Sequence, residues 1–396
     1  MRSDILSWRY SLTATVLLLS PFDLLASLGM DMYLPVVPRM AGILGTSPLL
    51  IQLTLTFYLV LIGAGQLVFG PLSDRFGRRP VLLGGAMAYV MASVGLALAT
   101  RGDVFLALRL VQAAGASACL VATFATVRDI YAGRDESNVI YGLLGSMLAM
   151  VPAIGPLLGA LVEIWLGWRA IFALLGLAMT FPLIATFFLW PETRQRTETG
   201  LRWRDLLAPL GRLNFWQYTL SYGAGMGSFF VYFSVAPWLL MARHGLSQTL
   251  FSLLFASVAI AMMATARLVG RLVPRFGIAR IMATGMFCLM AGAGILALTE
   301  SLIPRSIMGF IAPMWLIGVG ISMAVSVAPN GALRGFDHIA GTVTAVYFCL
   351  GGLLLGGFGT LAVTLLPRQS AWPIVAFCGF VPIIVLMIRH FNRDQS

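Results

Sequence analysis

The chain contains no lysine and has little charge of any kind. Of its 396 residues, 10% are charged and 59% are hydrophobic. A soluble domain carries about 25% charged residues. So few charged groups cannot cover a surface that faces water, so the composition excludes a soluble fold and indicates that lipid is the solvent.

Groupings that make an enzyme or a metal site are also missing. The four cysteines lie in apolar runs without CxxC spacing, the three histidines are far apart, and no Ser/His/Asp set or phosphate-binding loop is present. The net charge of +11 includes no basic tract outside short loops, so no nucleic-acid partner is expected. We therefore expect no enzyme activity, no metal and no cofactor.

What the chain does have is long apolar runs. An apolar run of this length in lipid must be a helix, because each backbone group has to be hydrogen-bonded within its own segment. The sequence therefore predicts an all-α membrane protein with twelve spans. They fall at about 11–35, 49–70, 81–100, 104–126, 138–161, 168–190, 214–241, 250–271, 280–299, 306–329, 340–366 and 372–389.

An internal repeat divides the chain into two halves. Residues 70–80 read GPLSDRFGRRP and residues 270–280 read GRLVPRFGIAR, with Pro274 in place of Asp74. We expect each stretch to be a short basic loop between two spans. The polar segment 191–213 is predicted to be a cytoplasmic linker between a six-helix half at 1–190 and a pseudo-symmetric six-helix half at 214–396.

The arginines indicate the orientation. Nineteen of the 26 fall on the side that holds both termini, and six fall on the opposite side. Loops rich in basic residues stay in the cytoplasm. Both termini are therefore expected to be cytoplasmic.

Two carboxylates lie in the first predicted span, at Asp23 and Asp31. Burying one ionisable residue in a span costs about 2.5–3.5 kcal/mol, so two in one helix need a reason. Eight residues correspond to about 12 Å of rise, so both side chains could face one polar cavity at different depths. Burial favours the neutral acid, which makes both residues candidate proton carriers. Alternatively, one of them lies at the membrane interface.

Arg109 is the one arginine that falls well inside a predicted span. A buried guanidinium needs partners, and we expect these to be the first-span carboxylates. The alternative is an arginine that reaches the nearer membrane surface.

The fifth predicted span carries Pro152, Gly155, Pro156 and Gly159. Gly155 and Gly159 form a small-residue face, and Pro156 removes a backbone donor. We expect a bent helix that packs against the other half and moves. An ordinary kinked helix is the alternative.

Two further sets of residues are predicted from their chemistry. The loop after the second span is predicted to act as a conformational gate; alternatively, its positive charge only sets the orientation of the chain in the membrane. The gate residues are Gly70, Asp74, Arg75, Gly77, Arg78 and Arg79. A substrate cavity is expected to use Asp31 with aromatic, Met and amide side chains: Met30, Tyr33, Tyr58, Met147, Phe230, Phe233, Trp238, Asn330 and Tyr347. Asn330 could instead be a loop residue, because it follows Pro329 and precedes Gly331.

These motifs resemble the Major Facilitator Superfamily. The 70–80 stretch is similar to its signature between spans two and three, RLVQAAGAS to its span-four signature, and PAIGPLLGAL to its span-five antiporter signature. Over essentially its full length the chain resembles the Bcr/CflA-type drug:proton antiporters, most closely the chloramphenicol efflux proteins of the CmlA type. PFDLLASLGMDMYLP, LVATFATVRDIYAG, GMGSFFV and SVAPNGALRGFD carry that closer match.

The resemblance implies a function. A monomer in the bacterial inner membrane would export chloramphenicol or a related hydrophobic drug in exchange for protons by alternating access. Asp23, Asp31 and Arg109 would couple protons to substrate. A broad multidrug exporter is one alternative. A facilitator or symporter for a small nutrient is another, although these spans have few of the Asn, Gln and Glu residues that a sugar site needs.

Overall fold

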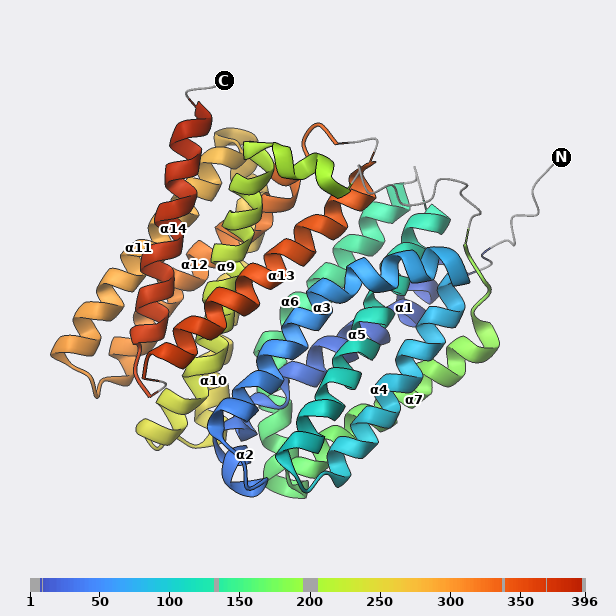
Figure 1. The fold of residues 1–396 in the computed structure, drawn as a ribbon, viewed down its shortest axis with the longest axis horizontal. Helices are drawn as coiled ribbons and strands as arrows, with labels where there is room; N and C mark the ends of the chain where they lie inside the picture. Colours follow the sequence, from blue (N-terminus) through green and yellow to red (C-terminus); the bar gives the residue numbers. More distant parts are fainter. Residues whose placement is uncertain are drawn as a thin grey trace. The chain divides into compact units, whose positions relative to one another are not determined.

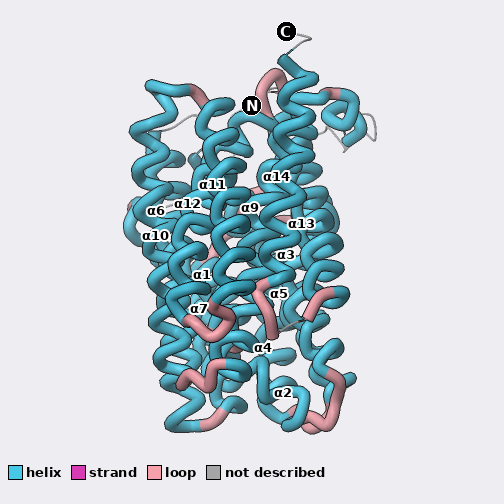
Figure 2. Tube along the Cα trace, turned by 90° about the vertical axis from the view of Figure 1, so that its left-hand side faces the viewer, coloured by secondary structure: helices cyan, strands magenta, loops and turns pink. Residues whose placement is uncertain are grey.

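Helices and short connections make up the fold. The computed structural model describes residues 8, 10–131, 135–194, 206–336, 339–367 and 369–393, which contain no strand (Figures 1 and 2). Among them, twelve helices are long and apolar enough to cross a membrane. The predicted fold class and number of spans are therefore confirmed.

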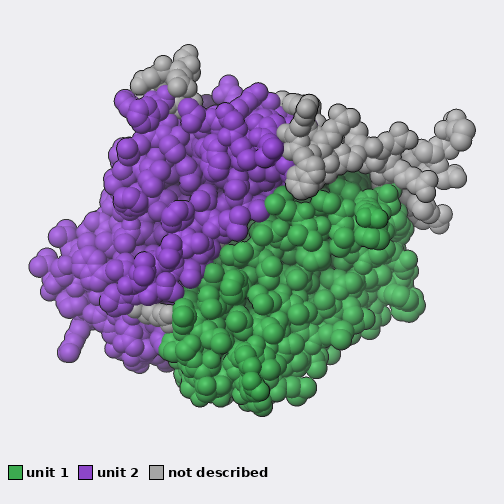
Figure 3. Space-filling view, in the orientation of Figure 1, with its two compact units in different colours: residues 1–200 green, residues 201–396 purple. Residues whose placement is uncertain are grey.

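The chain divides into two compact units, Met1–Gly200 and Leu201–Ser396, which Figure 3 colours separately. The division falls within the polar segment 191–213, of which residues 195–205 lie outside the described part. Each unit contributes six of the candidate spans.

The helices of unit 1 are α1 (Leu12–Asp31), η1 (Leu34–Val36), α2 (Val37–Ile43), α3 (Pro48–Phe76), α4 (Arg78–Leu98), α5 (Gly102–Tyr131), α6 (Asp135–Leu166) and α7 (Trp168–Leu189). Those of unit 2 are η2 (Ala208–Gly211), α9 (Leu213–Pro237), the π-helical turn η3 (Trp238–Arg243), α10 (Gln248–Phe276), α11 (Ile278–Leu302), α12 (Ile307–Ala332), α13 (Ala340–Leu365) and α14 (Trp372–Arg393). The first span combines α1, η1 and α2, and the seventh combines α9 and η3.

The repeated basic stretches are not loops, and this part of the prediction is wrong. Helix α3 continues to Phe76 and α4 begins at Arg78, so Gly77 alone connects them. In unit 2, Gly277 alone connects α10 and α11. Both glycines have positive φ, +110° and +76°, which residues with a Cβ rarely adopt. Gly70 lies inside α3, so it makes no turn.

The similarity between the two halves extends to the first residues of α3 and α10. Ser47 caps α3 by accepting a hydrogen bond from the Leu50 N–H, and Ser247 caps α10 by accepting one from the Leu250 N–H, both at 3.2 Å. Each serine side chain satisfies one of the N–H groups that have no partner within the helix. The same start and stop signals therefore frame the second helix of each half.

Small residues also allow the same close helix crossing in each unit. A Cβ added at Gly85 of α4 would lie 2.9 Å from the Gly115 carbonyl oxygen of α5. In unit 2, a Cβ added at Gly285 of α11 would lie 2.9 Å from the Gly320 carbonyl oxygen of α12. Such close approach strengthens helix packing in lipid.

Candidate functional site

The two carboxylates of the first span are both buried in α1. Asp23 is 1% exposed and Asp31 is 7% exposed. Both oxygens of Asp23 and one oxygen of Asp31 have no hydrogen-bond partner among the described residues. Both acids are therefore buried among protein atoms. A buried group of this kind is costly when charged and far less costly when protonated.

The two acids have different neighbours. Asp23 lies beside Thr123 and Cys119 of α5, although the Thr123 hydroxyl does not form a hydrogen bond to it. Asp31 lies against α6, where a Cβ added at Gly155 would come within 2.5 Å of the Asp31 Cβ. Asp31 therefore belongs to the α1–α6 contact and Asp23 to the α1–α5 contact.

Arg109 lies fully inside unit 1, on α5, and is 1% exposed. Its Nη1 donates to the Gly29 carbonyl oxygen at 2.8 Å and to Gln112 Oε1 at 2.7 Å. Gln112 in turn donates to Ser93 Oγ of α4 at 2.8 Å. This chain of hydrogen bonds joins α1, α5 and α4, and it excludes the alternative that Arg109 extends to a membrane surface.

Aromatic rings surround the same guanidinium. Its central carbon lies 4.3 Å from the ring centroid of Tyr58, 5.1 Å from that of Tyr33 and 5.8 Å from that of Phe172. The π-faces stabilise a cation, and the effect is largest where water is absent. Tyr33 and Tyr58, both predicted for the substrate cavity, therefore surround Arg109.

The expected ion pair between Arg109 and the first-span acids is not formed. Among the described residues Arg109 has no carboxylate within salt-bridge distance, and its contacts are a backbone carbonyl, an amide and aromatic rings. The reason is local: the Gly29 carbonyl lies in the last turn of α1, where carbonyl groups have no N–H donor further along the helix.

Tyrosine hydroxyls bind the same stretch of α1. Tyr58 donates to the Ala26 carbonyl oxygen and Tyr89 to the Leu25 carbonyl oxygen, each at 2.7 Å. A Cβ added at Gly29 would lie 2.6 Å from the Tyr58 hydroxyl and 2.5 Å from the Tyr89 hydroxyl. Gly29 therefore provides the space through which both hydroxyls reach the helix.

The glycine face of the fifth span packs against α1. Gly155 contacts Asp31, and a Cβ added at Gly159 would clash with the Met32 backbone. The prediction that this face packs against the other half is therefore wrong for these two residues, whose neighbours belong to unit 1. Pro152 and Pro156 lie inside the continuous helix α6. Because Gly155 and Gly159 have no side chain, the end of the first span can pack closely against α6.

The other predicted cavity residues are divided between the units. In unit 1, Met30 is buried and Met147 of α6 is half-buried. In unit 2, Phe230, Phe233 and Tyr347 are buried, while Trp238 is half-buried and Asn330 is exposed. Asn330 lies in the last turn of α12, so the alternative of a loop residue is wrong.

Two aromatic clusters in unit 2 surround these residues. Phe233 of α9 lies 6.1 Å from Phe255 of α10, which stacks on Tyr232 at 4.8 Å between centroids. Tyr347 of α13 lies 5.0 Å from Tyr222 of α9. The hydroxyl groups of Tyr232 and Tyr347 are buried without a hydrogen-bond partner among the described residues. Both units thus contain buried polar atoms that have no hydrogen-bond partner among the described residues.

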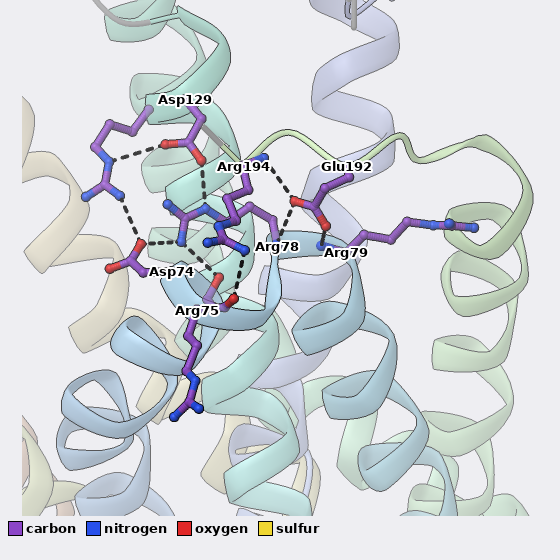
Figure 4. A network of polar contacts seen from close by, with 9 residues as sticks. Asp74, Arg75, Arg78, Arg79, Asp129, Glu192 and Arg194 are labelled. Carbon is purple, nitrogen blue, oxygen red and sulfur yellow. Dashed lines mark hydrogen bonds and ion pairs between the residues drawn. The ribbon is translucent and has the colours of Figure 1, made fainter. Parts of the chain in front are cut away.

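Asp74 and Arg78, two of the predicted gate residues, belong to a network of charges in unit 1 (Figure 4). Arg78 donates to Asp74 Oδ1 at 2.5 Å and to Asp129 Oδ2 at 2.7 Å, which ties the end of α3 and the start of α4 to α5. Arg128 lies 3.9 Å from Asp74 and 3.7 Å from Asp129. Asp74 therefore pairs with Arg78 and does not cap the following helix.

The cap of α4 comes from Glu192, which follows α7. Its Oε1 accepts a hydrogen bond from the Arg78 N–H at 2.9 Å, and its Oε2 accepts one from the Arg79 N–H at 3.2 Å (Figure 4). Arg194 donates to the Arg75 carbonyl oxygen at 2.7 Å. Asp129, Glu192 and Arg194 were not among the residues predicted for this gate. The sequence offered one signal for them: Asp129 and Glu192 are acidic residues that lie next to or near arginines at the ends of spans.

Within the described residues, no group of three or more His, Cys, Asp or Glu side chains is arranged to hold a metal ion. The chemical groups that the site contains are the buried acids, one buried cation and aromatic rings.

Comparisons with known proteins agree with this geometry. The family model described as Major Facilitator Superfamily matches residues 22–386. The chain is 68% identical over 396 residues to a chloramphenicol resistance protein of Pseudomonas aeruginosa, covering 100% of this chain and 94% of the relative. It is 27% identical over 364 residues to the multidrug resistance protein MdtL of Klebsiella pneumoniae, covering 91% of each.

Solved structures show the same fold. A D-xylose-proton symporter aligns with a TM-score of 0.72 at 16% identity, covering 95% of this chain and 97% of that one. A bacterial homologue of the human lysosomal transporter Spinster, in an inward-facing and occupied conformation, also aligns with a TM-score of 0.72, at 15% identity and with coverage of 96% and 95%.

Proposed function

The chain belongs to the Major Facilitator Superfamily, and from this premise we propose that it exports chloramphenicol or a related hydrophobic drug in exchange for protons. The relative that is 68% identical over the whole chain supports the substrate. The buried acids support the proton. The observation that carries the proposal is the presence of two buried carboxylates in α1, neither of them paired with the nearby Arg109.

Protonation of Asp31 or Asp23 is the proposed coupling step. A carboxylate without a counter-ion in apolar surroundings strongly favours the neutral form, so its charge responds to the proton supply on the side that the cavity faces. Asp31 lies where α6 packs on α1. A change of its charge therefore acts directly on a contact between two spans. Drug and proton would then compete for one conformational equilibrium, as antiport requires.

Arg109 is proposed to hold α1 in place while the acids titrate. Its hydrogen bond to Gly29 and its ring contacts fix the end of α1 near Asp31. The residues proposed to contact the substrate are, within unit 1, Met30, Asp31, Tyr33, Tyr58 and Met147. Within unit 2 they are Phe230, Phe233, Asn330 and Tyr347.

The charge network of Figure 4 is proposed to act as a gate. Breaking the Arg78–Asp129 pair would loosen the first turn of α4 from α5, and Glu192 couples the end of the sixth span to the same point. Because arginine-rich ends of spans stay in the cytoplasm, we place this network and both termini on the cytoplasmic side of a bacterial inner membrane. The transporter is proposed to act as a monomer and to need no cofactor beyond the proton gradient.

The proton gradient supplies enough free energy. One proton entering the cell releases about 2.3 kcal/mol per 100 mV of membrane potential and about 1.4 kcal/mol per pH unit. A neutral drug exchanged for one proton can therefore be held at a gradient of about fiftyfold by 100 mV alone.

Inverted membrane vesicles test the proposal. Vesicles containing the protein should accumulate labelled chloramphenicol only when a proton gradient is present, and a protonophore should abolish accumulation. Equal uptake with and without the gradient would instead indicate a facilitator. Protection of cells against lipophilic cations as well as phenicols would indicate a broad multidrug exporter, and accumulation of a sugar or organic acid with no drug transport would contradict the proposal.

A further inference from the structure

Hydroxyl side chains follow the contact between α1 and α5. At one point of this contact, Asp23 of α1 lies beside Thr123 of α5. At another point, the hydroxyl oxygens of Thr15 and Tyr131 lie 2.9 Å apart. The residue numbers fall along α1 as they rise along α5, so the two helices run antiparallel here. The contact therefore extends about 12 Å from the buried Asp23 to the last residue of α5.

Two threonine hydroxyls on α5 have no hydrogen-bond partner among the described residues. They belong to Thr123 and to Thr126, which follows about one helical turn later, and both side chains are fully buried. Thr180 of α7 shows the usual alternative, because its hydroxyl donates to the Gly176 carbonyl oxygen of its own helix. The two hydroxyls of α5 can therefore each donate one hydrogen bond and accept another, as a group that passes on a proton must.

The far end of this row leads to an exposed residue. The Thr15 hydroxyl donates to the Ser11 carbonyl oxygen at 3.0 Å, so the hydroxyl of Tyr131 donates to Thr15 and its own oxygen can still accept. Thr15 also accepts a hydrogen bond from Trp8 Nε1 at 2.7 Å. Thr15 is fully buried, whereas Ser11 is exposed. The hydrogen bonds thus lead from the interior of unit 1 to its surface.

The surroundings of the other acid are different. Tyr58 lies near Asp31, but its hydroxyl donates to the Ala26 carbonyl oxygen at 2.7 Å. That proton is therefore held by the backbone of α1. Asp23 lies beside a hydroxyl without a partner, and this difference favours Asp23 as the acid that the row of hydroxyls serves.

We propose that this row of hydroxyl groups, with bound water between them, carries the proton from Asp23 to the end of α5. The row consists of Thr123, Thr126, Tyr131 and Thr15. In each step one O–H bond breaks and one forms on the neighbouring oxygen, so a proton moves and no electron is transferred. Asp23 returns to its carboxylate, and water beside the exposed Ser11 takes the proton.

The path has a direction. Asp129 of the charge network lies two residues before Tyr131 on α5, so under the orientation proposed above the proton is released to the cytoplasm (Figure 4). The path rests on the proposed function, because it carries the proton that drug export requires.

Drug-induced proton release tests the path. The purified full chain is mixed with chloramphenicol in weakly buffered detergent solution, and a pH-indicator dye follows the release by stopped flow. Thr123→Val and Thr126→Val keep the shape of the side chain but remove its hydroxyl. Each should slow the release about tenfold at unchanged amplitude, a factor that one lost hydrogen bond accounts for. Asp23→Asn should remove this phase of release altogether.

The controls separate proton transfer from packing. Thr123→Ser and Thr126→Ser keep the hydroxyl but lose a methyl group, so they should release protons at the wild-type rate. Thr180→Val removes a half-buried hydroxyl that is bonded within its own helix, and it should leave the rate unchanged. Tyr131→Phe removes the last hydroxyl of α5 and should also slow release, which keeps the path testable even if a valine variant does not fold.

Three results would overturn the path. The first is release at the wild-type rate in the valine variants and in Tyr131→Phe. The second is equal slowing in Thr180→Val, or no recovery with serine, because either would indicate a change in packing. The third is full release from Asp23→Asn, which would assign the proton to Asp31 and leave the proposed function intact. Absence of any drug-induced release from the wild type would contradict the proposed function itself, and the path with it.

Discussion

The Arg109 guanidinium donates a 2.8 Å hydrogen bond to the Gly29 carbonyl oxygen. Helix α1 ends at Asp31, and the Tyr33 N–H bonds to the Met30 carbonyl oxygen rather than to that of Gly29. Arg109 therefore caps the C-terminal end of α1, where the helix dipole favours a cation. The consequence is that the nearby carboxylates remain without a counter-ion.

Neutralising the first-span acids should abolish coupling. In Asp31→Asn and Asp23→Asn the side chain can no longer gain or lose a proton, so drug accumulation in inverted vesicles should fall from a gradient of tens-fold to near equality. Drug binding, measured by equilibrium dialysis, should persist. Unchanged proton-driven accumulation in both variants would refute their assignment as proton carriers.

Replacing Arg109 by lysine should destabilise unit 1 although the charge is kept. An ammonium group cannot reproduce the planar donors that reach Gly29 and Gln112 while the face of the group lies over Tyr58. We expect a loss of about 1–3 kcal/mol, measured by thermal unfolding in detergent. Arg169→Lys is the control, because Arg169 also contacts an aromatic ring and a carbonyl oxygen but is exposed. Equal losses in both variants would argue against a specific role for Arg109.

Gly159→Ala should disturb the α1–α6 contact. The added methyl group would meet the Met32 backbone, which cannot move aside as a flexible side chain would. Overpacking of this kind costs about 1–3 kcal/mol. Gly142→Ala in the same helix has open space and should be neutral or slightly stabilising. Unfolding temperatures of the two variants give the comparison, and identical values would contradict the packing described here.

Asp129→Asn should weaken the charge network of Figure 4. Asp129 and Arg78 have side chains that are 9% and 5% exposed, so removal of the carboxylate leaves a largely buried cation with one acid fewer. We expect a loss of up to about 3 kcal/mol, the low end for a broken buried pair. Asp103→Asn, which removes an exposed pair with Arg101, should change unfolding little. If the network does not stabilise the fold, Asp129→Asn and Asp103→Asn should give the same small change in the free energy of unfolding.

Glu192→Gln tests the cap on α4. Glutamine keeps one acceptor oxygen but loses the charge that the N-terminal end of a helix favours, so a loss of about 0.3–1 kcal/mol is expected. High salt should partly reduce the difference from the wild type, because Glu192 is only half-buried and its charge is therefore screened in part. A difference that does not depend on salt would indicate lost packing rather than lost charge.

Several features of the candidate site were visible in the sequence and others were not. Asp23, Asp31 and Arg109 were predicted because an ionisable residue in an apolar run stands out at once. Their partners were predicted wrongly, because pairing by charge overlooks backbone acceptors such as the Gly29 carbonyl. Glu192 was missed because its target is the N–H groups of Arg78 and Arg79, 114 and 113 residues away along the chain.

The junctions between α3 and α4 and between α10 and α11 were also predicted only in part. The repeat identified Gly77 and Gly277 as equivalent, and the high apolar content on either side located the spans. That a single residue makes each turn depends on φ, which the sequence constrains only by allowing glycine to take positive values.

The sequence by itself determined that the solvent is lipid, that there are twelve spans, and that ionisable groups lie within the apolar interior. These follow from hydrophobicity along the chain, which is a property of each residue alone. Only the tertiary structure decided which donor meets which acceptor. Every residue has a carbonyl oxygen, so the sequence does not show which one a given donor reaches. In unit 1 this is set by the positions at which small residues allow α1, α4, α5 and α6 to come close to one another.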